Sequence, residues 1–280
     1  MRYGLIGEKL GHSYSPEIHE ALGLYSYELV EIAPADLDAF MTERDFSGIN
    51  VTIPYKQAVL PYLDSMSERA RAVGAVNTIV NRNGSLYGDN TDVGGLAGLI
   101  ERMGLDLHGK TVLIAGTGGA SKAALAVAQE FGAKETVLLS RSERNGALTY
   151  EDAYARFANA EILINTTPVG MYPDVDGIPV VLERLPHLDG VVDVVYNPIE
   201  TRLVKEARAR GIKAESGLYM LVAQALLSAE LFSGQAFSES DVEEAYERLL
   251  TEKAGSTTAA SNRAAHSTCD NDTPNKEDTR

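Results

Sequence analysis

The stretch that decides the fold is TVLIAGTGGASKAAL, residues 111–125. A mostly apolar run comes first, then a turn that contains Gly116, Gly118 and Gly119, then an alanine-rich segment. This pattern predicts a buried strand, a tight turn and a helix. Glycines let a ligand approach the backbone closely, and the first turn of the helix offers free N–H groups to a phosphate. The stretch is therefore a candidate pyrophosphate site.

Four residues of this turn are assigned to cofactor binding: Gly116, Gly118, Gly119 and Ala120. The spacing follows the G-x-G-x-x-G pattern, with Ser121 where Gly or Ala is usual at the third position. The strand before the turn and the helix after it supply the context that the pattern requires. The alternative is a turn with a structural role only.

The next predicted strand ends in LLSRSER, residues 138–144. A site for NAD usually has Asp or Glu near this point, to bind the ribose 2′-hydroxyl. This chain has Ser140, Arg141 and Arg144 instead, and arginine beside small hydroxyls suits the 2′-phosphate of NADP. The sequence therefore predicts NADP as the cofactor. The alternative is a solvated loop that binds nothing.

Strands and helices alternate along the whole chain, which predicts an α/β protein. In the second half the predicted strands are strongly apolar, which indicates a parallel sheet covered on both faces. A length of 280 residues suits two domains. Two helices follow, at about 217–234 and 238–250. The polar, aperiodic residues after about Gly255 lead us to expect a disordered tail over residues 251–280.

The net charge, the length of the apolar runs and the cysteine count argue against several classes of protein. A net charge of −15 argues against binding to nucleic acid and to an anionic membrane. No run reaches the length of a membrane span, and the N-terminus lacks the apolar core of a signal peptide. Cys269 is the only cysteine, so no intrachain disulfide is expected. These features together predict a cytoplasmic protein.

Polar residues of the first half form a second candidate site. The stretch GHSYSPEIH, residues 11–19, places Ser13 and Ser15 just before a predicted helix, where two hydroxyls can bind a carboxylate. Alternatively, Ser15 serves only as the N-cap. His12 and His19 are seven residues apart with no carboxylate in register, so no metal site is assigned.

The stretch INVTIPYKQAVL, which begins at residue 49, is predicted to be a strand that runs into a helix. Thr52 would share a strand face with Asn50, and Lys56 follows the strand end. Asn77 and Asp92 lie at the ends of two further short strands. Each alone could be a cap or turn residue. Together they are a hydroxyl-binding set with one cation and one anion, which a polyhydroxylated acid would need.

From Met1 to about Leu250 the chain resembles the shikimate dehydrogenase family. Eight motifs occur in the order that this family has. They are GHSYSPEIH, NVTIPYK, GAVNT, GDNTD, GTGGAS, NTTPVGM, DVVYNPIETRL and GLYMLVAQA. The resemblance implies reversible reduction of 3-dehydroshikimate to shikimate with NADPH, on the route to chorismate and the aromatic amino acids.

The resemblance also implies the domain organisation. A substrate domain would comprise residues 1–98 and be completed by helices in 219–250 that return to it. A Rossmann NADP domain, doubly wound, would comprise residues 99–218. Partners would be the small-molecule substrate and no nucleic acid or membrane, and the chain would be a monomer or homodimer.

Residue roles follow from the same resemblance. Lys56 and Asp92 match the catalytic pair of the family, and a nearby carboxylate favours the charged form of lysine. The residues that match substrate ligands are Ser13, Ser15, Thr52, Asn77, Tyr196 and Gln224. Gly217, which lines the cleft in relatives, is added to the cofactor-binding residues. Thr166 is added because the stretch INTTPVGM is expected to end a Rossmann strand beside the nicotinamide.

Two other functions stay open at this stage. A quinate/shikimate dehydrogenase that prefers NAD would place an acidic residue at the end of the second Rossmann strand, where this chain has Ser140. A catalytically silent NADP-binding sensor could lose Lys56 or Asp92, and both residues are present.

Overall fold

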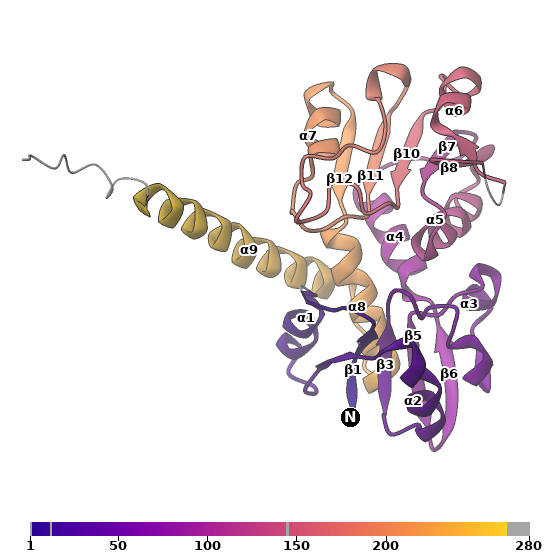
Figure 1. Cartoon of the computed structure of the whole chain (residues 1–280), viewed down its shortest axis with the longest axis vertical. Coiled ribbons are helices and arrows are strands. Elements are labelled where there is room, and N and C mark those ends of the chain that lie inside the picture. Colours follow the sequence, from indigo (N-terminus) through magenta and orange to yellow (C-terminus); the bar gives the residue numbers. More distant parts are fainter. Residues whose placement is uncertain (1, 12, 144–145, 268–280) are drawn as a thin grey trace, which may run out of the picture.

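The computed structural model describes residues 2–11, 13–143 and 146–267, which form two α/β lobes beside each other (Figure 1). The strands are β1 (Tyr3–Gly7), β2 (Glu28–Glu31), β3 (Gly48–Val51), β4 (Ser65–Met66), β5 (Thr78–Arg82), β6 (Ser85–Asp89), β7 (Thr111–Ala115), β8 (Glu135–Ser140), β9 (Leu148–Thr149), β10 (Ile162–Asn165), β11 (Gly190–Asp193) and β12 (Lys213–Ser216). The α-helices are α1 (Ser15–Ala21), α2 (Leu37–Glu43), α3 (Glu68–Val73), α4 (Thr91–Arg102), α5 (Gly119–Glu130), α6 (Tyr150–Arg156), α7 (Arg202–Ala209), α8 (Leu218–Ser233) and α9 (Glu239–Ser267). Short 3₁₀ helices are η1 (Pro34–Asp36), η2 (Leu60–Tyr62) and η3 (Leu182–Arg184).

The first lobe is built on a mixed six-stranded sheet in the order β2-β1-β3-β5-β6-β4. Strands β2, β1 and β3 are parallel, whereas β5 and β6 form an antiparallel hairpin beside β3. The predicted helix after β3 is absent. Residues 53–59 form turns that end in η2, where Pro61 lacks the N–H that a helix interior needs.

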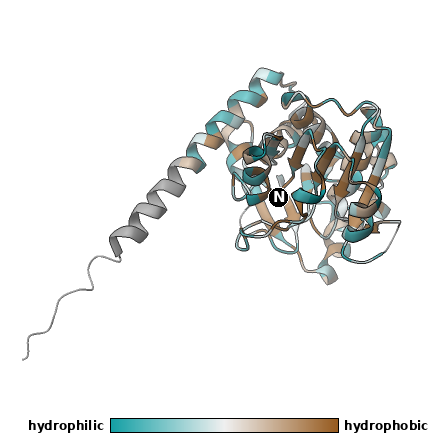
Figure 2. Cartoon of the chain, turned by 90° about the horizontal axis from the view of Figure 1, so that it is seen from above, coloured by the Kyte–Doolittle hydropathy of each residue, from teal (hydrophilic) through white to brown (hydrophobic). Residues whose placement is uncertain are grey.

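The second lobe contains the predicted parallel sheet, in the order β12-β11-β10-β7-β8-β9. Its central strands β7, β10 and β11 are buried along their whole length, as a sheet covered on both faces requires. Figure 2 shows hydrophobic strands in the interior of the molecule and hydrophilic residues on its outside. Counted from β7, the order is that of a doubly wound dinucleotide-binding fold. The strand order reverses between β7 and β10, so the glycine turn after β7 lies where such folds bind their ligands. The predicted α/β class and Rossmann fold are confirmed.

Helices α4 and α8 connect the two lobes. Helix α4 leads from β6 of the first sheet to β7 of the second, and α8 leads back from β12 to pack on α1 and β5. The two helices pack closely on each other, and the largest buried cluster contains side chains from α4, α8, α9 and the second sheet. The predicted return of the C-terminal helices to the first lobe is therefore confirmed.

The predicted domain limits fall in these connecting helices. The limit between residues 98 and 99 lies inside α4, and that between 218 and 219 lies at the start of α8. Both helices contribute to the shared core, so neither is a linker. The division into residues 1–98 and 99–218 stays a prediction.

The C-terminal segment differs from the prediction of a disordered tail over 251–280. Helix α9 continues to Ser267 and projects away from the two lobes (Figure 1). Five alanines between residues 254 and 265 favour a helix. The segment has no periodic pattern of large apolar residues, so the sequence analysis did not predict a helix there. The remainder of the predicted tail, 268–280, lies outside the described residues. In the described part of the chain, no helix combines the length and hydrophobicity of a membrane span.

Gly95 permits the close approach of α4 to α8. A Cβ added there would lie 2.7 Å from the carbonyl oxygen of Met220 and 2.9 Å from Cβ of Gln224. At Gly98, one turn later, the nearest atom would be a ring carbon of Tyr219 at 3.5 Å, which is ordinary contact. Only the first of these glycines is therefore required by packing.

We predict that Gly95→Ala destabilises the protein by about 1–3 kcal/mol, because α4 and α8 must move apart. Gly98→Ala is the matched control and should stabilise by about 0.5–1 kcal/mol, since alanine favours a helix. Denaturant unfolding of both variants measures the difference. Equal free energies of unfolding would show that the helices do not depend on this contact.

Candidate active site

A cavity of about 200 Å³ lies between the lobes. Both lobes line it, and ten predicted site residues are among the lining: Ser13, Ser15, Thr52, Lys56, Asn77, Asp92, Ala120, Tyr196, Gly217 and Gln224. They come from elements far apart in the chain, including the turn after β3, the first turn of α4 and the middle of α8. Polar groups converge here on a space that suits a small molecule.

Lys56 and Asp92 form an ion pair in this cavity. The Lys56 Nζ lies 2.5 Å from Oδ2 of Asp92, and the side chains are 18% and 10% exposed. The other carboxylate oxygen of Asp92 accepts a hydrogen bond of 2.9 Å from Nδ2 of Asn77. This bond holds the carboxylate in place and leaves the ammonium at the cavity wall.

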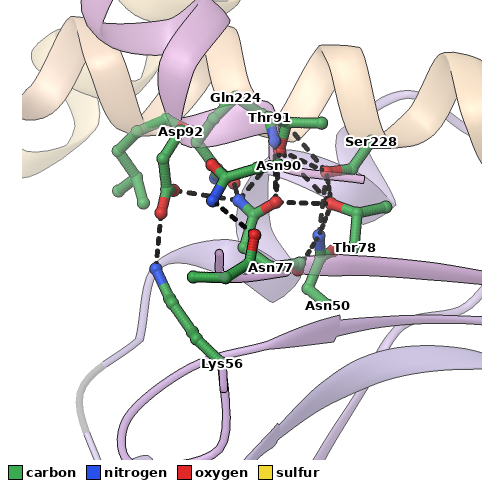
Figure 3. A network of polar contacts seen from close by, with 11 residues as sticks. Asn50, Lys56, Asn77, Thr78, Asn90, Thr91, Asp92, Gln224 and Ser228 are labelled. Carbon is green, nitrogen blue, oxygen red and sulfur yellow. Dashed lines mark hydrogen bonds and ion pairs between the residues drawn. The ribbon is translucent and has the colours of Figure 1, made fainter. Parts of the chain in front are cut away.

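A buried network of amides and hydroxyls holds Asn77 (Figure 3). The Asn77 oxygen accepts from the backbone N–H of Thr91 at 2.7 Å. Nearby, Nδ2 of Asn50 donates to Thr78 Oγ1 at 3.0 Å and to Ser228 Oγ at 2.8 Å. The network thus joins β3, β5, α4 and α8 behind the cavity.

The sequence analysis did not select Thr78, Thr91 or Ser228. Each hydroxyl is fully buried in the structure. The one signal in the sequence is a polar residue within an otherwise apolar strand or helix. That signal cannot tell which of these residues meet, because they come from separate elements.

Ser13 and Ser15 lie together in the lining of the cavity. Ser13 Oγ donates to Ser15 Oγ at 3.1 Å and accepts from the Ser15 N–H at 3.2 Å. Ser15 is the first residue of α1 and Tyr14 is its N-cap, so the alternative role of Ser15 as N-cap is wrong. The ring of Tyr14 points onto that of Tyr196, with centroids 5.4 Å apart.

Gln224 of α8 also lines the cavity, next to Asn77. Its Nε2 donates to the carbonyl oxygen of Leu221 at 2.8 Å, and its Oε1 accepts a long bond of 3.5 Å from Asn77. The side chain is partly exposed to the cavity. A ligand hydroxyl can therefore reach it.

A second cavity, of about 530 Å³, adjoins the first on the side of the parallel sheet. Its lining includes the predicted cofactor residues Gly116, Gly118, Gly119, Ala120, Ser140, Arg141 and Thr166, and also Tyr150, which the sequence analysis did not select. Arg144 lies outside the described residues. Gly217 lines the first cavity rather than the second.

The glycine turn has the shape that a dinucleotide site needs. Gly116 has a φ of +110°, and a Cβ there would lie 2.6 Å from Oγ1 of Thr166. Gly118 is the N-cap of α5, and it lines the second cavity together with Gly119 and Ala120 of the first turn. Ser121 donates to the carbonyl oxygen of Gly118 at 2.7 Å, which closes the turn.

The two cavities share three lining residues: Thr52, Lys56 and Ala120. The stem of Lys56 lies against the glycine turn, since a Cβ on Gly119 would be 3.5 Å from its Cδ. One ammonium group is therefore within reach of the ligands of both cavities. In the described residues no three His, Cys, Asp or Glu side chains group as metal ligands do.

Asp193 supports the loops on the side of the second sheet. It is fully buried and accepts from Asn165 at 2.8 Å, from the Val195 N–H at 3.1 Å and from Thr201 at 2.7 Å. Burial raises the pKa of this carboxyl from 3.8 to about 6, although these donors act in the opposite direction. The residue fixes the ends of β10 and β11, beside which Thr166 and Tyr196 line the cavities.

An aromatic cluster lies behind Asn50. The ring of His19 stacks on Tyr27 at 4.0 Å, and Tyr27 donates to the Asn50 oxygen at 2.6 Å. His19 bonds to the Tyr25 hydroxyl through Nδ1 at 2.8 Å, and its Nε2 is buried without a hydrogen-bond partner. Burial lowers the pKa of His19 from 6.5 to about 3.

The fold and the site together define a class of protein. A Rossmann sheet with an open cavity at its switch point, adjoining a polar cavity with a lysine–carboxylate pair, is the arrangement of a dinucleotide-dependent dehydrogenase. Comparison with known proteins narrows this class. Residues 5–79 match the model of the shikimate dehydrogenase substrate binding domain.

Relatives cover nearly the whole chain. A shikimate dehydrogenase (NADP(+)) of Clostridium perfringens is 38% identical over 267 residues, which are 88% of this chain and 97% of the relative. The crystal structure of shikimate dehydrogenase 1 from Peptoclostridium difficile is 38% identical with a TM-score of 0.82, and covers 90% of this chain and 99% of its own. A Thermus thermophilus shikimate 5-dehydrogenase in complex with NADP(H) and shikimate is 34% identical with a TM-score of 0.78, over 89% and 99% of the two chains. The chain belongs to the shikimate dehydrogenase family.

The lowered pKa of His19 leads to a prediction about acid stability. Between pH 6.5 and about 3 the unfolded chain binds a proton at His19 that the folded chain does not, so this residue lowers the free energy of unfolding as the pH falls. We expect the imidazole to stay neutral from pH 7 down to about pH 4, as measured by the nitrogen chemical shifts of His19. The exposed His108 and His187 serve as references in the same spectrum. Half-protonation of His19 above pH 5 would contradict the prediction.

Proposed function

We propose that this protein catalyses the reversible, NADPH-dependent reduction of 3-dehydroshikimate to shikimate, a step toward chorismate and the aromatic amino acids. Lys56 at the junction of the two cavities is the observation that carries the proposal. A dehydrogenase must bring a proton donor to the point where cofactor and substrate meet. Membership of the family supports the same activity.

Lys56 and Asp92 are proposed as the catalytic pair. Bound NADPH supplies the hydride to the carbonyl carbon at C3 of the substrate. The carbonyl oxygen then gains negative charge, which a protonated Lys56 stabilises and neutralises by giving up a proton. Asp92 orients the ammonium through the 2.5 Å contact. In the oxidation direction the same pair takes the proton from the hydroxyl.

The remaining lining of the first cavity is proposed to bind the substrate. Ser13 and Ser15 would bind the carboxylate, because their hydroxyls lie side by side at one wall. The ring hydroxyls would be bound at the other wall, and Tyr196 would cover the ring. The proposed hydroxyl ligands are Thr52, Asn77 and Gln224.

The second cavity is proposed to hold NADP. The glycine turn and the start of α5 would bind the pyrophosphate, and Arg141 with Ser140 would bind the 2′-phosphate. An arginine and a serine at the end of β8 favour NADP over NAD. We further propose that the protein acts in the cytoplasm as a monomer or homodimer.

The first prediction concerns activity and Lys56. Reduction of NADP+ with shikimate should exceed turnover of shikimate with NAD+ and of quinate with either cofactor, as followed by absorbance. Lys56→Ala should lower kcat by about 10²–10⁴ with little change in the KM for shikimate, because a proton donor in the transition state is lost.

Lys134→Ala is the matched control for this variant. Lys134 is exposed in the turn before β8 and should keep full activity. Near-normal turnover of Lys56→Ala would refute the catalytic role. Stronger turnover of quinate or NAD+ would refute the substrate or cofactor assignment, and no turnover with any pair would favour the silent sensor.

The second prediction concerns cofactor choice. Arg141→Ala should raise the KM for NADPH about 10- to 100-fold, the effect of losing one hydrogen-bonded charge. The KM for NADH should stay the same, because NADH lacks the 2′-phosphate. Steady-state kinetics with both cofactors measures the ratio. An equal rise for both would mean that Arg141 acts on another part of the cofactor.

A further inference from the structure

Lys253 of α9 lies within the segment that the sequence analysis assigned to a disordered tail, yet it contacts the first lobe. Its ammonium pairs with Oε2 of Glu17 in the first turn of α1. The same ammonium lies 4.1 Å from the centroid of the Tyr14 ring. The Lys253 side chain is 20% exposed, so these contacts are partly shielded from water.

Both contacts are made with residues next to Ser13 and Ser15, which are proposed to bind the substrate carboxylate. Tyr14 stands between Ser13 and Ser15 in the chain, and its ring packs against Tyr196, which lines the cavity. Lys253 therefore contacts Tyr14, and Tyr14 contacts Tyr196. The two serine hydroxyls belong to the same segment as Tyr14, residues 13–15. Lys253 itself is not part of the cavity lining.

Helix α1 packs on α8 through buried side chains such as Ile18, whereas residues 13–14, which precede it, lie outside any helix or strand. Helix α1 is seven residues long and has no side-chain cap. The backbone N–H of Ser13 donates to the carbonyl oxygen of Leu10 at 3.1 Å. Leu249 of α9 is buried in the shared core, so α9 offers a fixed base from which Lys253 reaches Tyr14.

We propose that Lys253 is a positioning residue, which holds the Ser13–Ser15 segment in the geometry that binds the substrate carboxylate. This inference rests on the proposed function, in which Ser13 and Ser15 bind that group. A cation over an aromatic ring is attracted to its face, and the ion pair with Glu17 holds the ammonium in place. The segment is then ordered before the substrate arrives, which lowers the entropy lost on binding.

The test is steady-state kinetics of the full chain with Lys253→Ala. We expect the KM for shikimate to rise about 3- to 10-fold, the effect of one partly shielded cation–π contact, while kcat and the KM for NADP+ change less than about twofold. Lys253→Arg keeps a cation that can stack on Tyr14 and pair with Glu17, so it should restore the KM. Glu17→Gln, which removes one of the two contacts, should give an intermediate KM.

Arg248→Ala is the matched control, because Arg248 is an exposed cation on the same helix. It should leave all constants unchanged. An unchanged KM for shikimate in Lys253→Ala, an equal rise in Arg248→Ala, or a parallel loss of kcat would overturn the proposal. A lower melting temperature with an unchanged KM would likewise assign Lys253 a structural role only.

Ser13→Ala separates this inference from the function on which it rests. If Ser13→Ala raises the KM for shikimate and Lys253→Ala does not, only the role of Lys253 is wrong. If Ser13→Ala leaves the KM unchanged, the carboxylate assignment fails, and the role of Lys253 fails with it.

Discussion

Burial of the Asn77 amide where the two lobes meet is the constraint on which the active site depends. The side chain is 3% exposed, and a buried amide must find hydrogen-bond partners. Its oxygen accepts from the Thr91 N–H and its nitrogen donates to Asp92. The start of α4 is therefore held against the start of β5, and Asp92 in turn fixes the ammonium of Lys56.

The packing around Asn77 also joins the two lobes, so that both contribute to one active site. Helices α4 and α8 carry the chain between the sheets and pack on each other through Gly95, while Ser228 of α8 joins the buried network. The cavity at the switch point is lined mainly by the Rossmann lobe, and the polar cavity is lined by both lobes. Lys56 lines both because its stem crosses from the turn after β3 to the glycine turn.

Charge is distributed so that an acidic protein can bind two anions. The chain has a net charge of −15, yet a cation lines each cavity: Lys56, paired with Asp92, in the first and Arg141 in the second. At the wall that we propose to bind the substrate carboxylate, the lining residues Ser13 and Ser15 are uncharged, and the nearby pair of Lys253 and Glu17 carries no net charge. Binding there would depend on geometry more than on attraction at a distance, which is why the ordering of residues 13–15 matters.

Much of the fold and of the candidate site could be predicted from the sequence, because the patterns that indicate them are local in the chain. The parallel sheet follows from short apolar strands that alternate with helices, and the glycine turn follows from a spacing within six residues. Local signals also misled: the stretch after β3 forms turns, Ser15 does not cap α1, and α9 continues past residue 250. The short β4 and β9, of two residues each, carry too little pattern to be predicted.

The sequence by itself determined the fold class, the family and most residues of the two cavities, since each is encoded by neighbours along the chain. Only the tertiary structure decided that Thr78, Thr91 and Ser228 support Asn77, that Lys56 joins both cavities, and that Lys253 reaches Tyr14. These contacts join residues up to 239 positions apart, as Lys253 and Tyr14 are. Such contacts depend on how the helices pack across the lobes, which no local pattern of residues contains.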